Sequence, residues 1–193
     1  MPWHLTGKIG PFQSLNLRKT LAIITLLAAA IFLHKTVRAI SLPMEILMYP
    51  AGFTLMLYLV RKHEKPYIQD AMSFPPAWRP YFLCYLAALA ASVRWFNPFF
   101  IIYTCLWVPL VEEFYFRGVF YPLLLRKVPK TAAVFLLALI FTLVHARFDA
   151  RSLTLFILSL GYTLSYEATG NLWWPIMYHS FMNLLVGFRL VYI

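Results

Sequence analysis

Three charged side chains interrupt an otherwise apolar run of this chain, and they constrain its fold more than any other feature. The run extends over Pro98–Leu125, and its middle reads V-P-L-V-E-E-F-Y-F-R-G. The charged residues are Glu112, Glu113 and Arg117. An isolated ionised side chain at the centre of a bilayer costs about 2.5–3.5 kcal/mol or more. A helix that carries three of them must therefore have partners for them elsewhere in the chain.

Composition indicates an integral membrane protein. Of the 193 residues, 62% are hydrophobic and 12% are charged, and the mean hydropathy is +0.70. Soluble domains are closer to half apolar and a quarter charged. The net charge of +10 comes from Lys and Arg residues in short clusters between apolar runs, as is typical of charges that flank membrane spans. Because these residues form no long stripe or tail, we expect the lipid bilayer as a partner and no nucleic acid.

The apolar runs predict an all-α fold, a polytopic membrane helix bundle of about seven transmembrane helices. Six or eight are also compatible, because several runs are shorter than the ~20 residues of a perpendicular span. The candidate spans are Arg18–Ile40, Pro43–Val60, Tyr81–Val93, Pro98–Leu125, Thr131–Ala146, Leu153–Ala168 and Leu172–Tyr192.

No internal repeat or low-complexity tract divides the chain, so we predict a single integral-membrane domain over residues 1–193. Residues 1–16 are expected to form an interfacial leader and residues 17–96 the front helices. Residues 97–193 carry the polar motifs. The distribution of Lys and Arg between the predicted loops favours a cytoplasmic N-terminus.

The spacing of the three charges separates the two glutamates. On a helix Glu113 and Arg117 share a face, in the acid-before-base order that suits the helix dipole. Glu112 is rotated by about 100° from its neighbour and cannot meet the same arginine in the same geometry. We therefore interpret Glu113 as paired with Arg117 and Glu112 as the reactive carboxylate. The alternative is a buried charge cluster that only holds helices together.

Two later segments add polar groups on other predicted helices. His145 ends the sequence F-T-L-V-H, and His179 and Asn183 are one helical turn apart in H-S-F-M-N. His145 alone is also compatible with a structural or interfacial role. Together, a carboxylate beside an imidazole can remove a proton from water, and an imidazole with a carboxamide can donate to one oxyanion. The combined set predicts hydrolysis of a peptide bond within the membrane.

These three segments resemble the motifs of a known family. E-E-F-Y-F-R at Glu112–Arg117 matches EExxxR, F-T-L-V-H at Phe141–His145 matches FxxxH, and H-S-F-M-N at His179–Asn183 matches HxxxN. They are the motifs of the CAAX protease and bacteriocin-processing (CPBP/Abi) family of glutamic-type intramembrane proteases, which includes the type II CAAX prenyl endopeptidases. The motifs lie within Val108–Val186, in the family's order.

The resemblance implies a role for each motif residue. Glu112 is the general base, and His145 helps to bind and orient the water. His179 and Asn183 donate hydrogen bonds to the oxyanion. The second glutamate and the arginine of the first motif support the site from behind.

No cofactor is expected, although a metal must be considered. Two glutamates and two histidines could ligate zinc. However, the H-E-x-x-H pattern is absent, and the histidines lie on different predicted helices without fixed ligand spacing. We favour water activated by Glu and His, with a zinc-dependent variant of the same hydrolysis as the alternative.

The predicted function is that of an intramembrane endopeptidase in a prokaryotic inner membrane. Its expected substrate is a membrane-bound protein or peptide, such as a lipid-modified chain or a C-terminal sorting tail, and the family resemblance offers prenyl-CAAX cleavage as the alternative. A non-catalytic membrane scaffold of the same family is a second possibility, which the intact set of polar residues argues against. A small transporter is disfavoured, because the sequence shows no repeated half.

Overall fold

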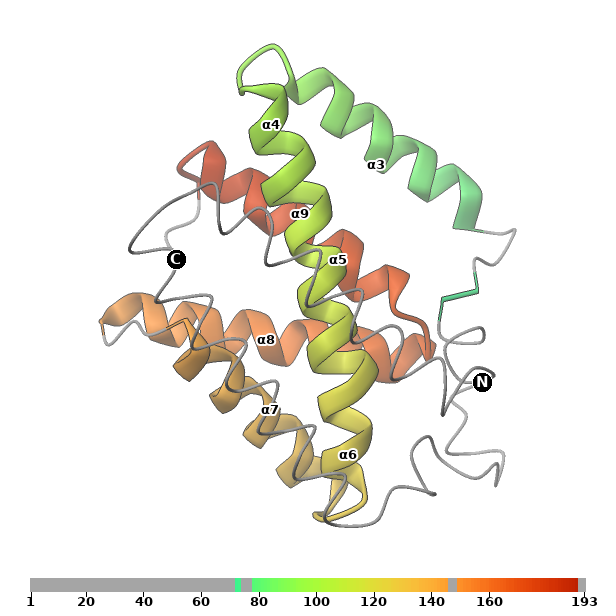
Figure 1. Cartoon of the computed structure of the whole chain (residues 1–193), viewed down its shortest axis with the longest axis vertical. Helices are drawn as coiled ribbons and strands as arrows, with labels where there is room; N and C mark the ends of the chain where they lie inside the picture. The colour runs from blue at the N-terminus through green and yellow to red at the C-terminus, as the bar shows by residue number, and fades with distance from the viewer. Residues whose placement is uncertain (1–71, 74–77, 146–148, 191–193) are drawn as a thin grey trace.

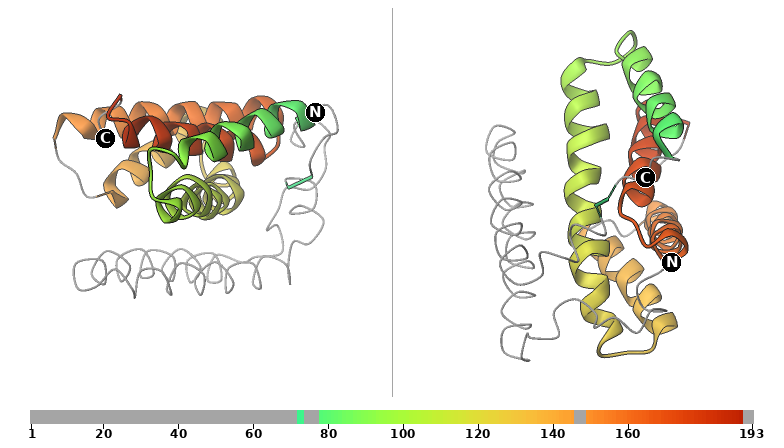
Figure 2. Two further views of the ribbon diagram at one scale, coloured as in Figure 1. Left: turned by 90° about the horizontal axis from the view of Figure 1, so that it is seen from above. Right: turned by 90° about the vertical axis from the view of Figure 1, so that its right-hand side faces the viewer.

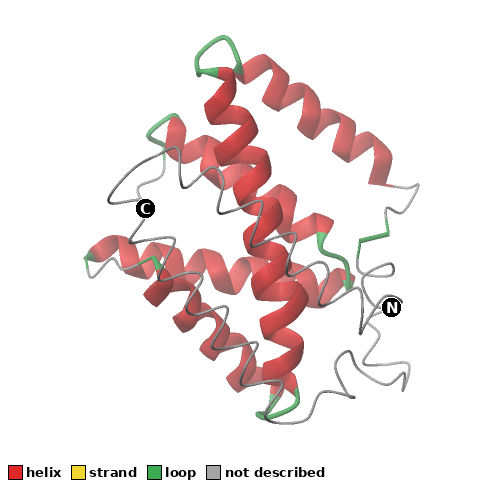
Figure 3. Ribbon diagram, in the orientation of Figure 1, coloured by secondary structure: helices red, strands yellow, loops and turns green. Residues whose placement is uncertain are grey.

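The computed structural model describes residues 72–73, 78–145 and 149–190. The predicted leader and the predicted spans Arg18–Ile40 and Pro43–Val60 lie outside the described residues. Every regular element within the described ranges is a helix (Figure 3), in agreement with the predicted all-α class.

One long helix runs through the centre of the described fold (Figure 1). It spans Pro98–Leu125 without interruption and is, among the described residues, the one helix that is both long and apolar enough to cross a membrane. Its consecutive parts are α4 (Pro98–Phe100), η3 (Ile101–Trp107), α5 (Val108–Glu113), η4 (Phe114–Phe120) and α6 (Tyr121–Leu125). At 28 residues it is about 42 Å long. The count of seven spans stays a prediction.

The other helices pack around this one. They are α3 (Arg79–Ser92), α7 (Lys130–Val144), α8 (Ala150–Thr169) and α9 (Trp173–Gly187). In both views of Figure 2, α3, α8 and α9 lie on one side of the long helix. The helix α9 contacts η3 and α5, whereas α7 contacts α6 and α8. Most of the buried apolar side chains of η4, α7 and α8 form a single cluster, which includes Phe116, Val119, Leu137, Phe141 and Tyr162.

Short sequence signals set several helix ends. The Asn97 side chain accepts a hydrogen bond from the Phe99 N–H at 2.8 Å, and Pro98 occupies the first helical position. At the far end of α8, Gly170 adopts a left-handed conformation with φ of 65°. The last helix is shorter than predicted, because it ends at Gly187 and Arg189 has a positive φ of 59°.

The two segments η3 and η4 are π-helical, and each is followed by an X-Pro pair. The Val108 N–H bonds the Tyr103 carbonyl, five residues back, and Pro109 follows at once. A proline within a helix has no N–H and clashes with the carbonyl four residues before it. A widened turn before the proline relieves that clash, and π-bulges are common at functional sites.

The irregular turn leaves two backbone carbonyls without their usual helical partners, those of Thr104 and Cys105. Side chains of α9 donate to both. Asn183 Nδ2 donates to the Thr104 carbonyl at 2.8 Å, and Ser180 Oγ donates to the Cys105 carbonyl. In an apolar environment freed backbone groups must be satisfied by neighbouring helices. These two bonds therefore fix the register of α9 on the long helix.

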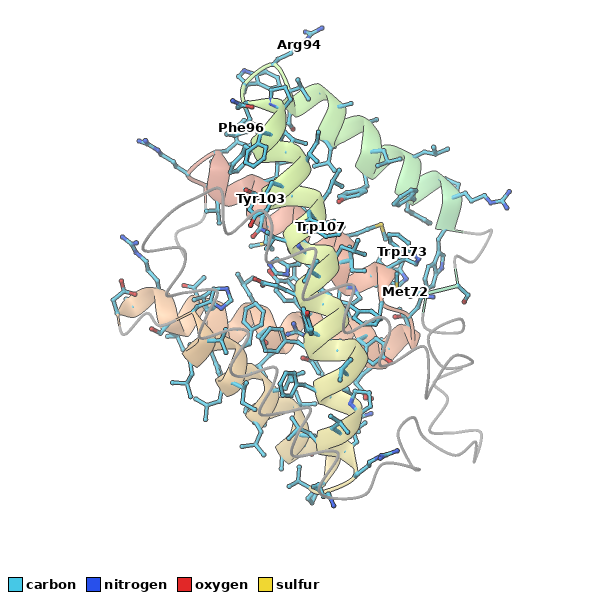
Figure 4. The ribbon with its side chains drawn as sticks, in the orientation of Figure 1. Met72, Arg94, Phe96, Tyr103, Trp107 and Trp173 are labelled. Atoms are coloured by element: carbon cyan, nitrogen blue, oxygen red, sulfur yellow. The ribbon has the colours of Figure 1, made fainter. Side chains whose placement is uncertain are left out.

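The turn between α8 and α9 is tied to the segment that precedes α3. Trp173 Nε1 donates to the Met72 carbonyl at 3.0 Å, and both residues are labelled in Figure 4. Asn171 Nδ2 donates to the Ser73 carbonyl. This end of α9, six residues before His179, is thus held by two bonds to the same short segment.

Candidate active site

The two glutamates of the first motif lie at the end of α5, next to the π-helical segment η4. Glu113 and Arg117 have fully buried side chains and form an ion pair, with 3.0 Å between Arg117 Nη1 and Glu113 Oε1. This is the pairing predicted from their spacing. A buried pair of this kind is stable only when further hydrogen bonds satisfy its remaining donors and acceptors.

Helix α8 satisfies the remaining donors of Arg117. Arg117 Nη2 donates to the carbonyl oxygen of Ser159 at 2.8 Å and to its hydroxyl at 2.6 Å. Arg117 Nε donates to Thr163 Oγ1 at 3.3 Å. Each nitrogen of the guanidinium therefore has an acceptor. The charge of Arg117, which was predicted to need partners, has them on the long helix and on α8.

Glu113 also holds a histidine. Its Oε1 atom lies 2.8 Å from His179 Nδ1. An ionised carboxylate can only accept, so Nδ1 carries the hydrogen in this contact. That bond directs the opposite nitrogen, Nε2, towards Glu112, with 3.9 Å between His179 Nε2 and Glu112 Oε2.

His145 reaches the same oxygen from the end of α7. Its Nδ1 lies 2.8 Å from the Phe141 carbonyl, which can only accept, so the hydrogen is again on Nδ1. His145 Nε2 lies 4.0 Å from Glu112 Oε2. Two imidazoles anchored at Nδ1 thus present Nε2 to one carboxylate oxygen.

These separations are too long for direct hydrogen bonds and too short for a water on the line between the two atoms, so a bridging water must lie to one side of that line. The side chains of His179 and Glu112 are 7% and 13% exposed, whereas that of His145 is 29% exposed. The site is therefore most accessible from the side of His145.

Asn183 lies one turn after His179 on α9 and is buried. Its Nδ2 donates to the Thr104 carbonyl, so it holds α9 against η3. A carboxamide nitrogen carries a second N–H. The predicted donation from Asn183 to an oxyanion stays a prediction.

Aromatic rings enclose the two histidines. The Tyr162 ring is stacked on the His179 imidazole, with centroids 4.8 Å apart and an interplanar angle of 14°. The Phe141 ring lies 4.6 Å from the His145 ring and 6.0 Å from the His179 ring. The imidazoles are thus confined on their faces as well as at Nδ1.

Sequence reasoning missed the contribution of α8. Ser159, Tyr162 and Thr163 are spaced as i, i+3 and i+4 and so face the same side of the helix. Ser159 and Thr163 are polar residues within a predicted span, where a polar side chain needs a partner. A search for partners of Arg117 among the polar residues of the other spans would have found both.

The geometry also bears on zinc. No group of three His, Cys, Asp or Glu side chains in the described part of the chain is placed to hold a metal ion. Two ligands of a tetrahedral zinc ion with bonds of about 2.0 Å lie about 3.3 Å apart. The separations of 3.9 and 4.0 Å at Glu112 are longer, so these side chains would have to move inwards to bind zinc.

Comparison with known proteins gives one family. Residues 94–185 match the family model described as type II CAAX prenyl endopeptidase Rce1-like. The matched range contains all three motifs and confirms the family resemblance that they indicated. Searches of curated proteins and of solved structures returned no match.

Proposed function

We propose that this protein is a glutamic-type intramembrane endopeptidase, because residues 94–185 match the family model of type II CAAX prenyl endopeptidases that are Rce1-like. Its reaction is hydrolysis of a peptide bond at or near the membrane. The observation that carries this proposal is the convergence of two imidazole Nε2 atoms on one oxygen of Glu112.

In the proposed first step, a water bound between Glu112 and His145 attacks the substrate carbonyl. Glu112 Oε2 takes a proton from that water, and the water oxygen forms a bond to the carbonyl carbon. The carbonyl oxygen becomes an oxyanion. The Nδ1–H of His145 donates to the Phe141 carbonyl, so Nε2 accepts a hydrogen bond from the water and orients it.

His179 and Asn183 are proposed to act on the oxyanion. His179 donates through Nε2 only as an imidazolium, because its Nδ1–H is held by Glu113. A buried carboxylate behind an imidazole stabilises that charged form, as the aspartate does in a Ser-His-Asp triad. The second N–H of Asn183 is the other proposed donor.

In the final step the peptide bond breaks. The tetrahedral intermediate collapses, the C–N bond cleaves, and the proton held by Glu112 passes to the leaving nitrogen. The products are a new carboxyl terminus and a free amine. Each proton taken from the attacking water is accounted for without an added cofactor.

We propose a substrate that is itself bound to the membrane, either a lipid-modified chain or a C-terminal sorting tail. Glu112 lies midway along a helix long enough to cross a membrane, which would favour a peptide brought there by an anchor. Prenyl-CAAX cleavage is the alternative suggested by the family's description. We further propose a multi-pass protein in a prokaryotic inner membrane with a cytoplasmic N-terminus.

The test is a cleavage assay with purified protein in lipid vesicles. Matched peptides would be offered with a prenylated CAAX end, with the same end unprenylated, and with a hydrophobic sorting tail, and mass spectrometry would locate the cut. Internal cleavage of an anchored peptide supports the proposal. Folded protein that cleaves no anchored peptide would overturn it.

A further inference from the structure

We propose that Tyr162 is a positioning residue that holds the His179 imidazole in its working orientation by stacking on it. This role rests on the proposed function of the site. Tyr162 lies outside the three motifs, on α8, which contributes no residue to them. The first observation is the near-parallel stack, with ring centroids 4.8 Å apart and planes 14° apart.

One hydrogen bond alone would not fix the imidazole. The bond from His179 Nδ1 to Glu113 Oε1 leaves the ring able to tilt about that contact. A large flat ring against one face prevents the tilt, and the edge-on ring of Phe141 at 6.0 Å limits movement on another side. With the tilt prevented, Nε2 stays directed at Glu112.

Tyr162 itself is held rigidly enough to act as such a support. It is 2% exposed, and its ring makes an edge contact with Tyr178 at 4.9 Å. The Arg117 guanidinium carbon lies 5.3 Å from the centre of the ring. Tyr162 therefore contacts both partners of Glu113, the arginine and the histidine.

The ring also suits the charge that the mechanism develops on His179. The face of an aromatic ring attracts a cation placed over it. An imidazolium stacked on Tyr162 is favoured by that attraction in addition to its bond with Glu113. The hydroxyl takes no part in restraining the imidazole or in attracting its charge. A phenylalanine at position 162 should therefore perform both roles.

The same helix provides a matched control. Tyr166 is one turn beyond Tyr162, is 3% exposed, and packs edge-on against Tyr121 with centroids 6.2 Å apart. Replacing it removes a buried aromatic ring of the same size from the same helix. Tyr121 begins α6, eight residues beyond Glu113 along the long helix.

The experiment compares Tyr162→Phe, Tyr162→Leu and Tyr166→Leu for kcat, KM and thermal unfolding. Tyr162→Leu should lower kcat by up to about 100-fold, the loss expected for a displacement near 1 Å, with little change in KM. Tyr162→Phe should restore the wild-type kcat. Tyr166→Leu should lose stability but keep kcat. A normal kcat in Tyr162→Leu, or an equal loss in Tyr166→Leu, would overturn the proposal.

A second measurement requires no substrate. Nitrogen-15 NMR of labelled histidines, with the His179 signals assigned from a His179→Gln variant, reports which ring nitrogen carries hydrogen. Wild type and Tyr162→Phe should show one set of His179 ring signals with hydrogen on both Nδ1 and Nε2, the imidazolium that donates to the oxyanion, and Tyr162→Leu should show exchange between forms. Identical spectra for the wild-type and leucine proteins overturn the positioning role. If Tyr162→Leu shows the expected exchange but the wild-type protein cleaves no peptide, the proposed hydrolysis is overturned and the positioning role is not.

Discussion

Glu112 and Glu113 are adjacent in sequence, yet their surroundings assign them different tasks. Glu113 is fully buried, and its Oε1 atom contacts both Arg117 and His179. Glu112 is 13% exposed and faces two imidazole Nε2 atoms. A carboxylate whose Oε1 atom is held by a cation and an imidazole is suited to support. A carboxylate that faces two imidazole nitrogens without a direct bond to either is suited to take a proton from a water that they orient.

The first prediction concerns Glu113→Gln. The substitution preserves size but removes the charge that balances Arg117 in a fully buried pair. Breaking such a pair on one side costs about 3–5 kcal/mol, so both folding yield and thermal stability should fall. Activity should fall as well, because a neutral carboxamide no longer stabilises the imidazolium form of His179. A Glu113→Gln variant as stable and active as wild type would show that the pair has no supporting role.

The second prediction ranks two partners of Arg117 on α8. Ser159→Ala removes a 2.6 Å bond to the guanidinium, whereas Thr163→Val removes a 3.3 Å bond. Loss of a hydrogen bond to a charged group costs about 1.5–3 kcal/mol when the geometry is good. Thermal unfolding should therefore show the larger loss in Ser159→Ala. The reverse order would contradict the geometry described for Arg117.

At the scale of elements, the π-helical turn within the long helix explains the position of α9. The π-helical turn of η3 and the proline that follows it leave two carbonyls for side chains of α9 to bond. Tyr85 of α3 adds to the same network by donating to Ser180 Oγ at 2.6 Å. His179 is the residue next to Ser180, so its position depends on these bonds.

A double-mutant cycle tests this arrangement. Ser180→Ala alone should destabilise the protein, because the Cys105 carbonyl loses a donor. Pro109→Ala supplies a backbone N–H that can bond the same carbonyl in its place. The double variant should therefore be more stable than the sum of the two single effects predicts. Additive effects on the thermal midpoint would mean that Ser180 and Pro109 do not share this carbonyl.

The sequence predicted local features better than contacts between helices. The start of the long helix at Pro98 and the pairing of Glu113 with Arg117 follow from neighbouring residues, and both are confirmed. The bonds from Arg117 to α8 join residues more than 40 positions apart. Such contacts depend on how helices pack, which spacing within one helix does not encode.

The end of the last helix shows a different limit. Its composition stays apolar up to Tyr192, so the prediction extended the helix beyond Gly187. The backbone conformation of Arg189 stops it earlier. Hydropathy detects an apolar segment but not the residue at which its backbone leaves the helix. The π-helical turns were missed for the same reason.

At the scale of the whole molecule, a helix outside the range matched by the family model packs against the helices within it. The match begins at residue 94, after α3 ends at Ser92. Even so, α3 is tied to α9 by Tyr85 in its middle and by the ring contact of Phe82 with Trp173 near its start. The helix that carries His179 thus depends on a neighbour outside the matched range.

A prediction for the intact protein concerns metal. We propose hydrolysis by water activated without a metal ion, so exhaustive chelation should leave cleavage unchanged. The measurement is the cleavage rate before and after chelation, together with the metal content of the protein. Loss of activity that zinc alone restores would favour the zinc-dependent alternative.

The central claim is that Glu112 activates the attacking water. It is tested most directly by cleavage in water labelled with oxygen-18, comparing wild type with Glu112→Gln. Glu167→Gln is the matched control, because Glu167 is also a buried glutamate but pairs with Lys130. Wild type and the control should place one labelled oxygen in the new carboxyl terminus, and loss of the general base should slow Glu112→Gln by about 100-fold or more. Cleavage by Glu112→Gln at the wild-type rate would contradict the account.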